Sequence, residues 1–155
     1  IMSDYTYFYN NLVQLTRNKD LYQNFESQDD FSDRLVFLLI HLAFFFKVFK
    51  TSENSSSLQN IYDFIFRQLE LSIREIGYGD QTINKKMKDY LNLFHSIIDK
   101  IHFWELMKIN DKIKLFDKLL DKSKNNDFLE DYFNKYFEIL KNNSLNSYLK
   151  SVGKA

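Results

Sequence analysis

Histidine is the residue type in this chain that is best suited to bind a metal ion or a haem. The chain has three histidines and no cysteine, so thiolate ligands, disulfides and cysteine nucleophiles are excluded. His95 and His102 are seven residues apart in a segment expected to be helical, so they can face the same way. Two imidazoles without a third ligand make a weak metal site. We therefore expect neither a metal nor a cofactor, and haem or metal handling through the histidines is an alternative function.

The third histidine, His41, lies inside the most apolar stretch of the chain, LVFLLIHLAFFFKVF at Leu35 to Phe49. A lone histidine within an apolar helix is more often a hydrogen-bonded core residue than a ligand. Arg34 is seven residues earlier, on the same helical face, and Asp63 follows in the next predicted helix. We expect Arg34, His41 and Asp63 to form a buried polar network.

Catalysis is not expected. No nucleophile, base and orienting residue can be assembled from the sequence, and paired carboxylates are not distinctive among 21 acidic residues. The 21 basic residues balance this charge, so the composition gives no reason to expect nucleic acid as a partner. The sequence therefore predicts a protein that acts by binding.

A glycine pair marks the stretch SIREIGYGD at positions 72–80, in a chain that has only three glycines. Gly77 lies where a helix should end, at the position that favours a left-handed backbone. Gly79 lets the chain turn again, and Asp80 is placed to cap the amides of the next helix. Together with Glu75, these residues predict a tight corner between two helices. No strand precedes them, so they do not form a phosphate-binding loop.

Charged residues surround this corner. Asp63 and Arg67, and then Glu70 and Arg74, are each four residues apart in the stabilising order of acid before base. Beyond the corner, lysines add positive charge with few acids nearby. We predict a partner-binding edge made of Arg67, Arg74, Lys85 and Lys88.

Helix is the expected structure throughout, because proline is absent and apolar residues recur three and four positions apart. We predict an all-α, compact, single-domain bundle of about six helices that covers residues 1–155. Residues 51–57 and 122–126 are polar linkers too short to separate domains. The expected helices run from Ser3 or Asp4 to between Arg17 and Lys19, from Asp29 or Asp30 to Phe49, from Ser56 to Ile76 with Gln59 completing a capping box, from Asp80 or Thr82 to about Asn110, over 111–122 and over 127–141, with a short turn at 144–151.

The apolar stretch from Leu35 to Phe49 is too short to cross a bilayer, which needs about 20 apolar residues. It is expected to be a central buried helix and not a membrane-facing one; the functional alternative is that part of its surface forms a groove for an apolar client segment. Phe103, Trp104 and Met107 are expected in the core. No signal-peptide pattern is present near the start, so a cytoplasmic location is predicted.

Two quoted stretches carry a family resemblance: FSDRLVFLLIHLAFFFKVF and, after a polar linker, LQNIYDFIFRQLELSIREIGYGDQTINKKMKDYLNLF. They resemble the ubiquinol-cytochrome c chaperone family, whose bacterial members are similar to the core domain of a mitochondrial assembly factor. The family pattern has an Arg followed by Leu-His in an apolar helix, matched by Arg34 and by Leu39 to Leu42 with His41. It then has Arg-Glu-hydrophobic-Gly-hydrophobic-Gly-Asp, matched by Arg74 to Asp80, and a following Lys, matched by Lys85.

Two positions depart from that pattern. Asn84 stands where the family usually has a proline, and His95-Ser96-Ile97 replaces a Gly-Arg pair, so the role of that arginine is not carried over to this chain. The resemblance also extends to the opening stretch from Tyr9 to Tyr22, and so to nearly the whole chain.

The resemblance implies an assembly chaperone that is not an enzyme. Family members bind newly made cytochrome b, the membrane-embedded subunit of the ubiquinol-cytochrome c reductase (bc1) complex, until haem and partner subunits are added. The implied partners are cytochrome b as client and the surface of the inner membrane, at its cytoplasmic face. A small helical co-chaperone and a homodimer partner are both left open, and the blandest alternative is a structural helical interaction module.

Overall fold

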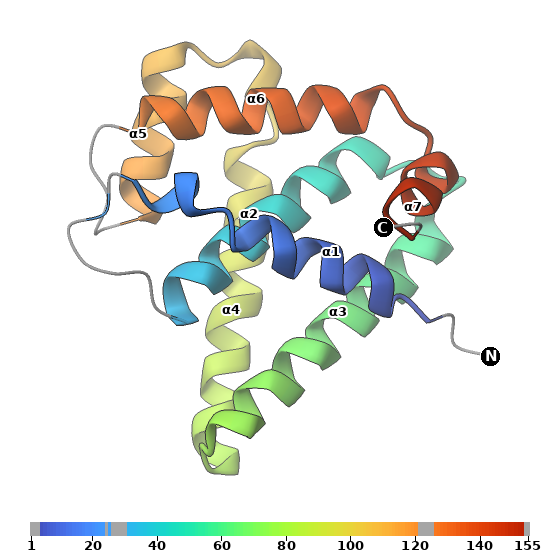
Figure 1. Ribbon diagram of the computed structural model, residues 1–155, viewed down its shortest axis with the longest axis vertical. Helices are drawn as coiled ribbons and strands as arrows, with labels where there is room; N and C mark the ends of the chain where they lie inside the picture. The colour runs from blue at the N-terminus through green and yellow to red at the C-terminus, as the bar shows by residue number, and fades with distance from the viewer. Residues whose placement is uncertain (1–3, 24, 26–30, 121–125, 154–155) are drawn as a thin grey trace.

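The computed structural model describes residues 4–23, 25, 31–120 and 126–153. These ranges hold seven α-helices, two short 3-10 helices and no β-strand. Figure 1 shows how the helices are arranged. The all-α prediction is confirmed, with one helix more than the six expected. The helices are α1 Thr6–Thr16, η1 Lys19–Tyr22, α2 Phe31–Phe49, α3 Ser55–Ile76, α4 Asp80–Lys100, η2 Trp104–Leu106, α5 Ile109–Leu119, α6 Asp127–Lys141 and α7 Leu145–Gly153.

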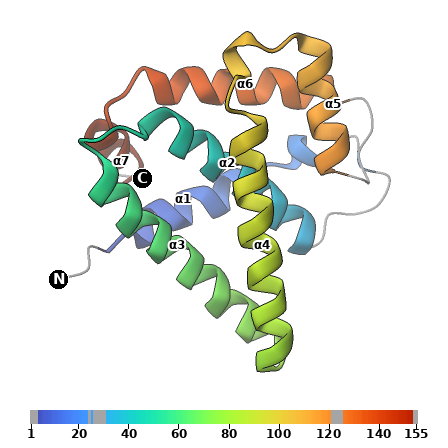
Figure 2. The same cartoon turned by 180° about the vertical axis from the view of Figure 1, so that it is seen from behind.

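Helix α2 lies at the centre of the molecule, and α1, α4 and α6 pack against it (Figures 1 and 2). Every side chain from Phe37 to Phe45 is at most 4% exposed. An apolar run of this length has no polar face to give to solvent, so other helices cover it on all sides. The expectation of a central buried helix is confirmed. No helix in the described part of the chain combines the length and hydropathy needed to span a bilayer.

Aromatic rings connect α2 to the C-terminal helices. Phe44 stacks on Phe133 of α6 with ring centroids 5.4 Å apart and meets Trp104 edge-on at 5.0 Å. Phe133 also stacks on Phe116 of α5 at 5.3 Å. All four rings are fully buried, and such pairs contribute about 0.5–1.5 kcal/mol each beyond the burial of their area.

The two longest helices, α3 and α4, form a V. They meet at the corner between Ile76 and Asp80 and diverge from it, and the corner lies at the end of the molecule farthest from α5 and α6 (Figures 1 and 2). The C-terminal part of α2 packs between the open ends of the V. This arrangement forms the walls and floor of the cavity described below.

The corner takes the conformation that the glycines predict. Gly77 has φ +104°, in the left-handed region, and its N–H donates to the carbonyl oxygen of Arg74 at 3.0 Å. Asp80 is the first residue of α4, but its carboxylate does not cap the helix as predicted. It accepts instead from Nη1 of Arg74 at 2.7 Å, an ion pair that joins the two helices across the turn.

Several helix boundaries differ from the sequence predictions, and α5 begins at Ile109, two residues before its predicted start. The capping box at Ser56 is wrong, because α3 begins one residue earlier and the amide of Gln59 donates to Asp63 at 3.0 Å. Helix α4 ends at Lys100 and not near Asn110, since Trp104 turns inward to the aromatic core. The predicted turn at 144–151 is part of a helix.

Two other boundary predictions have mixed outcomes. Asp4 does bind the start of α1, where its carboxylate accepts from the Thr6 amide at 2.9 Å. Ser3, Asp29 and Asp30, the other proposed caps, lie outside the described residues.

Candidate functional site

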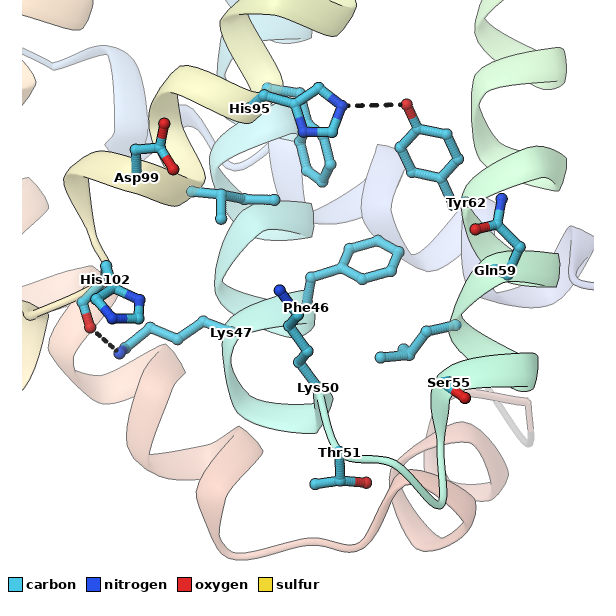
Figure 3. A pocket seen from close by; sticks show the side chains of 13 residues that line it. Phe46, Lys47, Lys50, Thr51, Ser55, Gln59, Tyr62, His95, Asp99 and His102 are labelled. Atoms are coloured by element: carbon cyan, nitrogen blue, oxygen red, sulfur yellow. Dashed lines mark hydrogen bonds between the residues drawn. The ribbon is translucent and has the colours of Figure 1, made fainter.

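A cavity of about 780 Å³ lies at the open end of the V. Figure 3 shows the side chains that line it. Helix α3 forms one wall, α4 forms the other, and the C-terminal turns of α2 form the floor. We call this cavity the cleft. Most of its polar lining residues are exposed, which shows that the cleft is open to solvent. It is lined by Phe46, Lys47, Lys50, Thr51, Ser55, Leu58, Gln59, Tyr62, Phe94, His95, Ile98, Asp99 and His102.

The floor of the cleft is aromatic. The ring of Phe46 meets those of Phe94 and Tyr62 edge-on, with centroid separations of 5.7 and 6.3 Å. Phe66 packs behind this group, 5.3 Å from Phe94 and 4.8 Å from Tyr62. Phe94 is buried, whereas Phe46 and Tyr62 are half-buried and present apolar surface to the cleft. Because these rings hold one another in place, the floor is formed before any ligand binds.

The rim of the cleft is polar. Tyr62 on α3 and His95 on α4 approach each other across the cleft, with 3.3 Å between the hydroxyl and Nε2 (Figure 3). Partial burial, and then the charge of Asp63, raise the pKa of Tyr62 above its ordinary value, so the hydroxyl stays protonated at neutral pH. Lys50 and Asp99 add one charge of each sign and form no ion pair among the described residues.

Lys47 holds the upper end of α4 against α2. Its ammonium lies 2.8 Å from the carboxylate of Glu105 and donates to the carbonyl oxygen of His102 at 2.7 Å. Partial burial is the largest single effect and raises the pKa of Glu105, but the hydrogen bond from Lys47, a backbone hydrogen bond and the charges of Lys47 and Lys141 together outweigh it, so the net pKa is lowered. Lys47 is therefore a structural cation of the cleft wall and is not free to bind a ligand.

The structure divides the three histidines. His95 and His102 both line the cleft, as their spacing predicted, and His41 is fully buried elsewhere. No group of three or more histidine or acidic side chains in the described part of the chain is arranged to hold a metal ion. What the cleft offers chemically is an apolar floor with hydrogen-bonding groups around it.

The predicted network around His41 is wrong. Nδ1 of His41 donates to the carbonyl oxygen of Phe37 at 2.7 Å, and Nε2 lies 2.7 Å from the hydroxyl of Tyr132. Both ring nitrogens are therefore occupied. Arg34 and Asp63 are exposed, because the faces of α2 and α3 that carry them point to solvent, so they do not form a buried network with His41.

The predicted partner-binding edge lies near the corner, away from the cleft. Arg67, Arg74, Lys85 and Lys88 are all exposed, and none of them lines the cavity. Arg74 pairs with Asp80 and, at 3.9 Å, with Glu70, which confirms one predicted pair. The other, Asp63 with Arg67, is not formed in the described structure.

Sequence reasoning offered a client groove on the apolar helix α2 but did not single out the residues of α3 and α4 that complete the cleft. Tyr62, Phe94 and Ile98 carry a helical spacing signal, but that signal assigns them equally well to a closed core. Only the angle between α3 and α4 leaves their side chains beside an open cavity. The substitution at residues 95–97 places His95 on the cleft wall, whereas Ile97 is buried in the core.

The sequence of the chain matches one known protein family. A sequence model described as ubiquinol-cytochrome C chaperone matches residues 23–101, half of the chain. The chain belongs to the ubiquinol-cytochrome C chaperone family. The family match covers α2, α3, the corner and α4, and it contains every residue that lines the cleft except His102. No curated protein and no solved structure matched the chain. As a member of a chaperone family, the protein acts on a client protein.

Proposed function

We propose that the protein is an assembly chaperone that binds cytochrome b during biogenesis of the bc1 complex, and that the cleft holds an apolar segment of this client. The observation that carries the proposal is the overlap of two spans. The span that matches the chaperone family contains all the residues that line the cleft except His102. The part of the chain shared with other chaperones is thus the part that forms a binding surface.

The cleft suits an apolar helix or loop. Docking such a segment removes the half-buried faces of Phe46, Tyr62 and Ile98 from water, at about 25 cal/mol per Å² of apolar area buried. The exposed groups at the rim, among them Gln59 and His95, stay in contact with water or with polar atoms of the client. Release needs no bond cleavage, so the proposed role requires no catalytic residue.

We place this activity at the cytoplasmic face of the inner membrane, because the proposed client is membrane-embedded. The cations of the corner edge support contact with acidic groups of the client. Arg67, Lys85 and Lys88 form no ion pair in the described part of the chain, so their charges are available. Arg74 is already bound to Asp80 and serves the corner first.

Co-purification tests the proposal. We would isolate the tagged protein in mild detergent from cells that make the bc1 complex and measure the cytochrome b recovered with it. The double variant Gln59→Glu/His95→Glu puts one carboxylate on each wall of the cleft, where an apolar segment would have to desolvate it. We expect recovery to fall at least about tenfold, which corresponds to about 1.4 kcal/mol.

The matched control is Asn60→Glu/Asn92→Glu, which adds the same charge to exposed positions of the same two helices outside the cleft lining. This control should recover cytochrome b as the wild type does. Equal recovery by the cleft variant and the wild type would contradict the assignment of the cleft. Absence of cytochrome b from the wild-type preparation would contradict the proposed client.

A second candidate, haem handling, has one observation in its favour, which is that His95 and His102 line one cavity. Titration of haem followed by absorbance spectroscopy tests it. Saturable one-to-one binding that is lost in His95→Ala or His102→Ala would support this function. The spectrum of free haem at every ratio would exclude it.

A further inference from the structure

The connection from α4 to α5 exposes three large apolar side chains within seven residues. Phe103, Leu106 and Ile109 are 63%, 79% and 61% exposed, more than any other large hydrophobic residue in the described structure. We call these three residues the apolar turn. The prediction that Phe103 belongs to the core is wrong, whereas Trp104 beside it is fully buried. The apolar turn lies outside the family match.

Contacts of the neighbouring residues fix the orientation in which the apolar turn is exposed. The indole nitrogen of Trp104 donates to Oδ1 of Asn134 at 2.9 Å, and the ammonium of Lys112 lies 4.4 Å from the indole ring while donating to the same oxygen. Lys47 binds the turn through Glu105 and the His102 carbonyl. These contacts hold Trp104 inward, so its neighbours Phe103 and Leu106 must point outward. Exposed apolar side chains on such a well-held turn are typical of a contact surface.

The shape and charge of the apolar turn indicate its partner. It forms a projecting end of the molecule, opposite the corner along α4 (Figures 1 and 2). Between residues 99 and 114, the exposed cations without an ion pair in the described part of the chain are Lys100, Lys108 and Lys114, against the acids Asp99 and Asp111, and Lys47 neutralises Glu105, which leaves a small excess of positive charge. Apolar side chains flanked by lysines complement the boundary between acyl chains and anionic headgroups.

We propose that the apolar turn inserts into the interfacial region of a bilayer that contains anionic lipid. The placement relative to the cleft supports this: His102 lines the cleft, and its ring packs against that of Phe103 with centroids 4.6 Å apart. Insertion would hold the upper end of the cleft against the bilayer surface. The biological reason for this contact rests on the proposed function, because the proposed client is embedded in the membrane. The binding to lipid itself does not depend on that function.

Vesicle co-sedimentation tests the proposal without any client. We would measure the partition of the full chain onto vesicles of phosphatidylglycerol and phosphatidylcholine at low and physiological salt. The variant Phe103→Ser/Leu106→Ser/Ile109→Ser should partition at least about tenfold more weakly than the wild type, because most of the affinity comes from buried apolar area. Circular dichroism confirms that both proteins are folded.

The matched control substitutes the three exposed apolar residues at the opposite end, as Leu71→Ser/Ile76→Ser/Tyr78→Ser. It should partition within about twofold of the wild type. A wild type that does not bind vesicles, or an equal loss in both triple variants, would overturn the proposal. So would loss of cytochrome b recovery from detergent extracts by the apolar-turn variant together with unchanged vesicle binding, which would make the surface a protein contact. If the wild type binds vesicles but cytochrome b is not recovered with it, the proposed lipid contact is supported and the proposed client is contradicted.

Discussion

His41 shows how one buried residue can connect distant helices. Because the carbonyl oxygen of Phe37 can only accept, Nδ1 carries the proton of the neutral ring, and Nε2 accepts from the hydroxyl of Tyr132. The ring thus joins α2 to α6. Burial lowers the pKa of His41 from 6.5 to about 4, although the hydrogen bond to Phe37 opposes this. At neutral pH the buried ring is uncharged.

This lowered pKa predicts a pH dependence of folding. The unfolded chain takes up a proton at His41 as pH falls below about 6.5, whereas the folded chain does so only near 4. The contribution of the neutral ring is thus fully present above pH 6.5 and is lost between 6.5 and 4, on the order of 3 kcal/mol. Urea unfolding at several pH values should show this loss. His41→Gln should show a shallower dependence, and identical slopes for both proteins would contradict the assignment.

Tyr132 provides a second test at this scale. Tyr132→Phe removes the donor to Nε2 of His41 and leaves a buried acceptor unsatisfied, so the free energy of unfolding should fall by about 1–3 kcal/mol. The control Tyr9→Phe removes a longer, 3.2 Å contact to Ser72, whose hydroxyl also donates to a backbone carbonyl. It should cost less than about 1 kcal/mol. Equal losses in the free energy of unfolding for the two variants would mean that the hydrogen bond between Tyr132 and His41 stabilises the fold no more than an ordinary tyrosine contact.

The sequence was sufficient to bury His41 but not to name its partners. Its apolar neighbours on every side predict burial. Tyr132 is 91 positions away, and only the packing of α6 on α2 brings the two together. Arg34 was predicted as a partner because it lies seven residues away on the same helical face, and Asp63 because it is an acid in the next predicted helix.

At the scale of elements, the corner was predictable because its signals are local. A glycine in the left-handed region and an acid at the start of the next helix both follow from backbone geometry within a few residues. The end of α4 was not predictable, since the apolar periodicity continues past Lys100. Trp104 ends the helix through contacts with α2 and α5, and this change of register exposes Phe103.

The corner glycines should differ sharply when substituted. Gly77→Ala puts a side chain at φ +104° and should lower the free energy of unfolding by about 1 kcal/mol or more. Gly79 has φ −74°, and an added Cβ would meet nothing within 4 Å, so Gly79→Ala should change stability by less than about 0.5 kcal/mol or increase it. Thermal or urea unfolding of the two variants measures this. A Gly79 variant that is the less stable of the two would contradict the structure of the corner.

At the scale of the whole molecule, α4 connects three surfaces in order: the charged corner edge, the cleft and the apolar turn (Figure 2). The fold class and the central helix were predictable from composition and periodicity. The cleft was not predictable from the sequence. It depends on the angle at which α3 and α4 diverge and on the side of this helix pair against which α2 packs, and no local sequence pattern encodes either. The predicted corner edge and the cleft are therefore separate regions of the same two helices, α3 and α4.

The corner edge makes its own prediction. Arg67→Glu/Lys88→Glu leaves the Arg74–Asp80 pair intact and reverses two free cations. If the edge contacts the client, recovery of cytochrome b should fall several-fold, and more at low ionic strength than at high, because exposed charges are screened by salt. The control Lys118→Glu/Lys150→Glu makes the same charge change on α5 and α7. Equal recovery by both variants would remove the edge from the binding surface.

Site-specific photocrosslinking tests the central claim, that the cleft holds cytochrome b, most directly. A photoreactive residue placed at Gln59 or His95, one on each wall, would be activated in cells that are assembling the bc1 complex. The same residue at Lys135, exposed on α6, is the control. We predict a crosslink to cytochrome b from both walls and none from α6. Crosslinks from α6 alone, or to other proteins from both walls, would contradict the account.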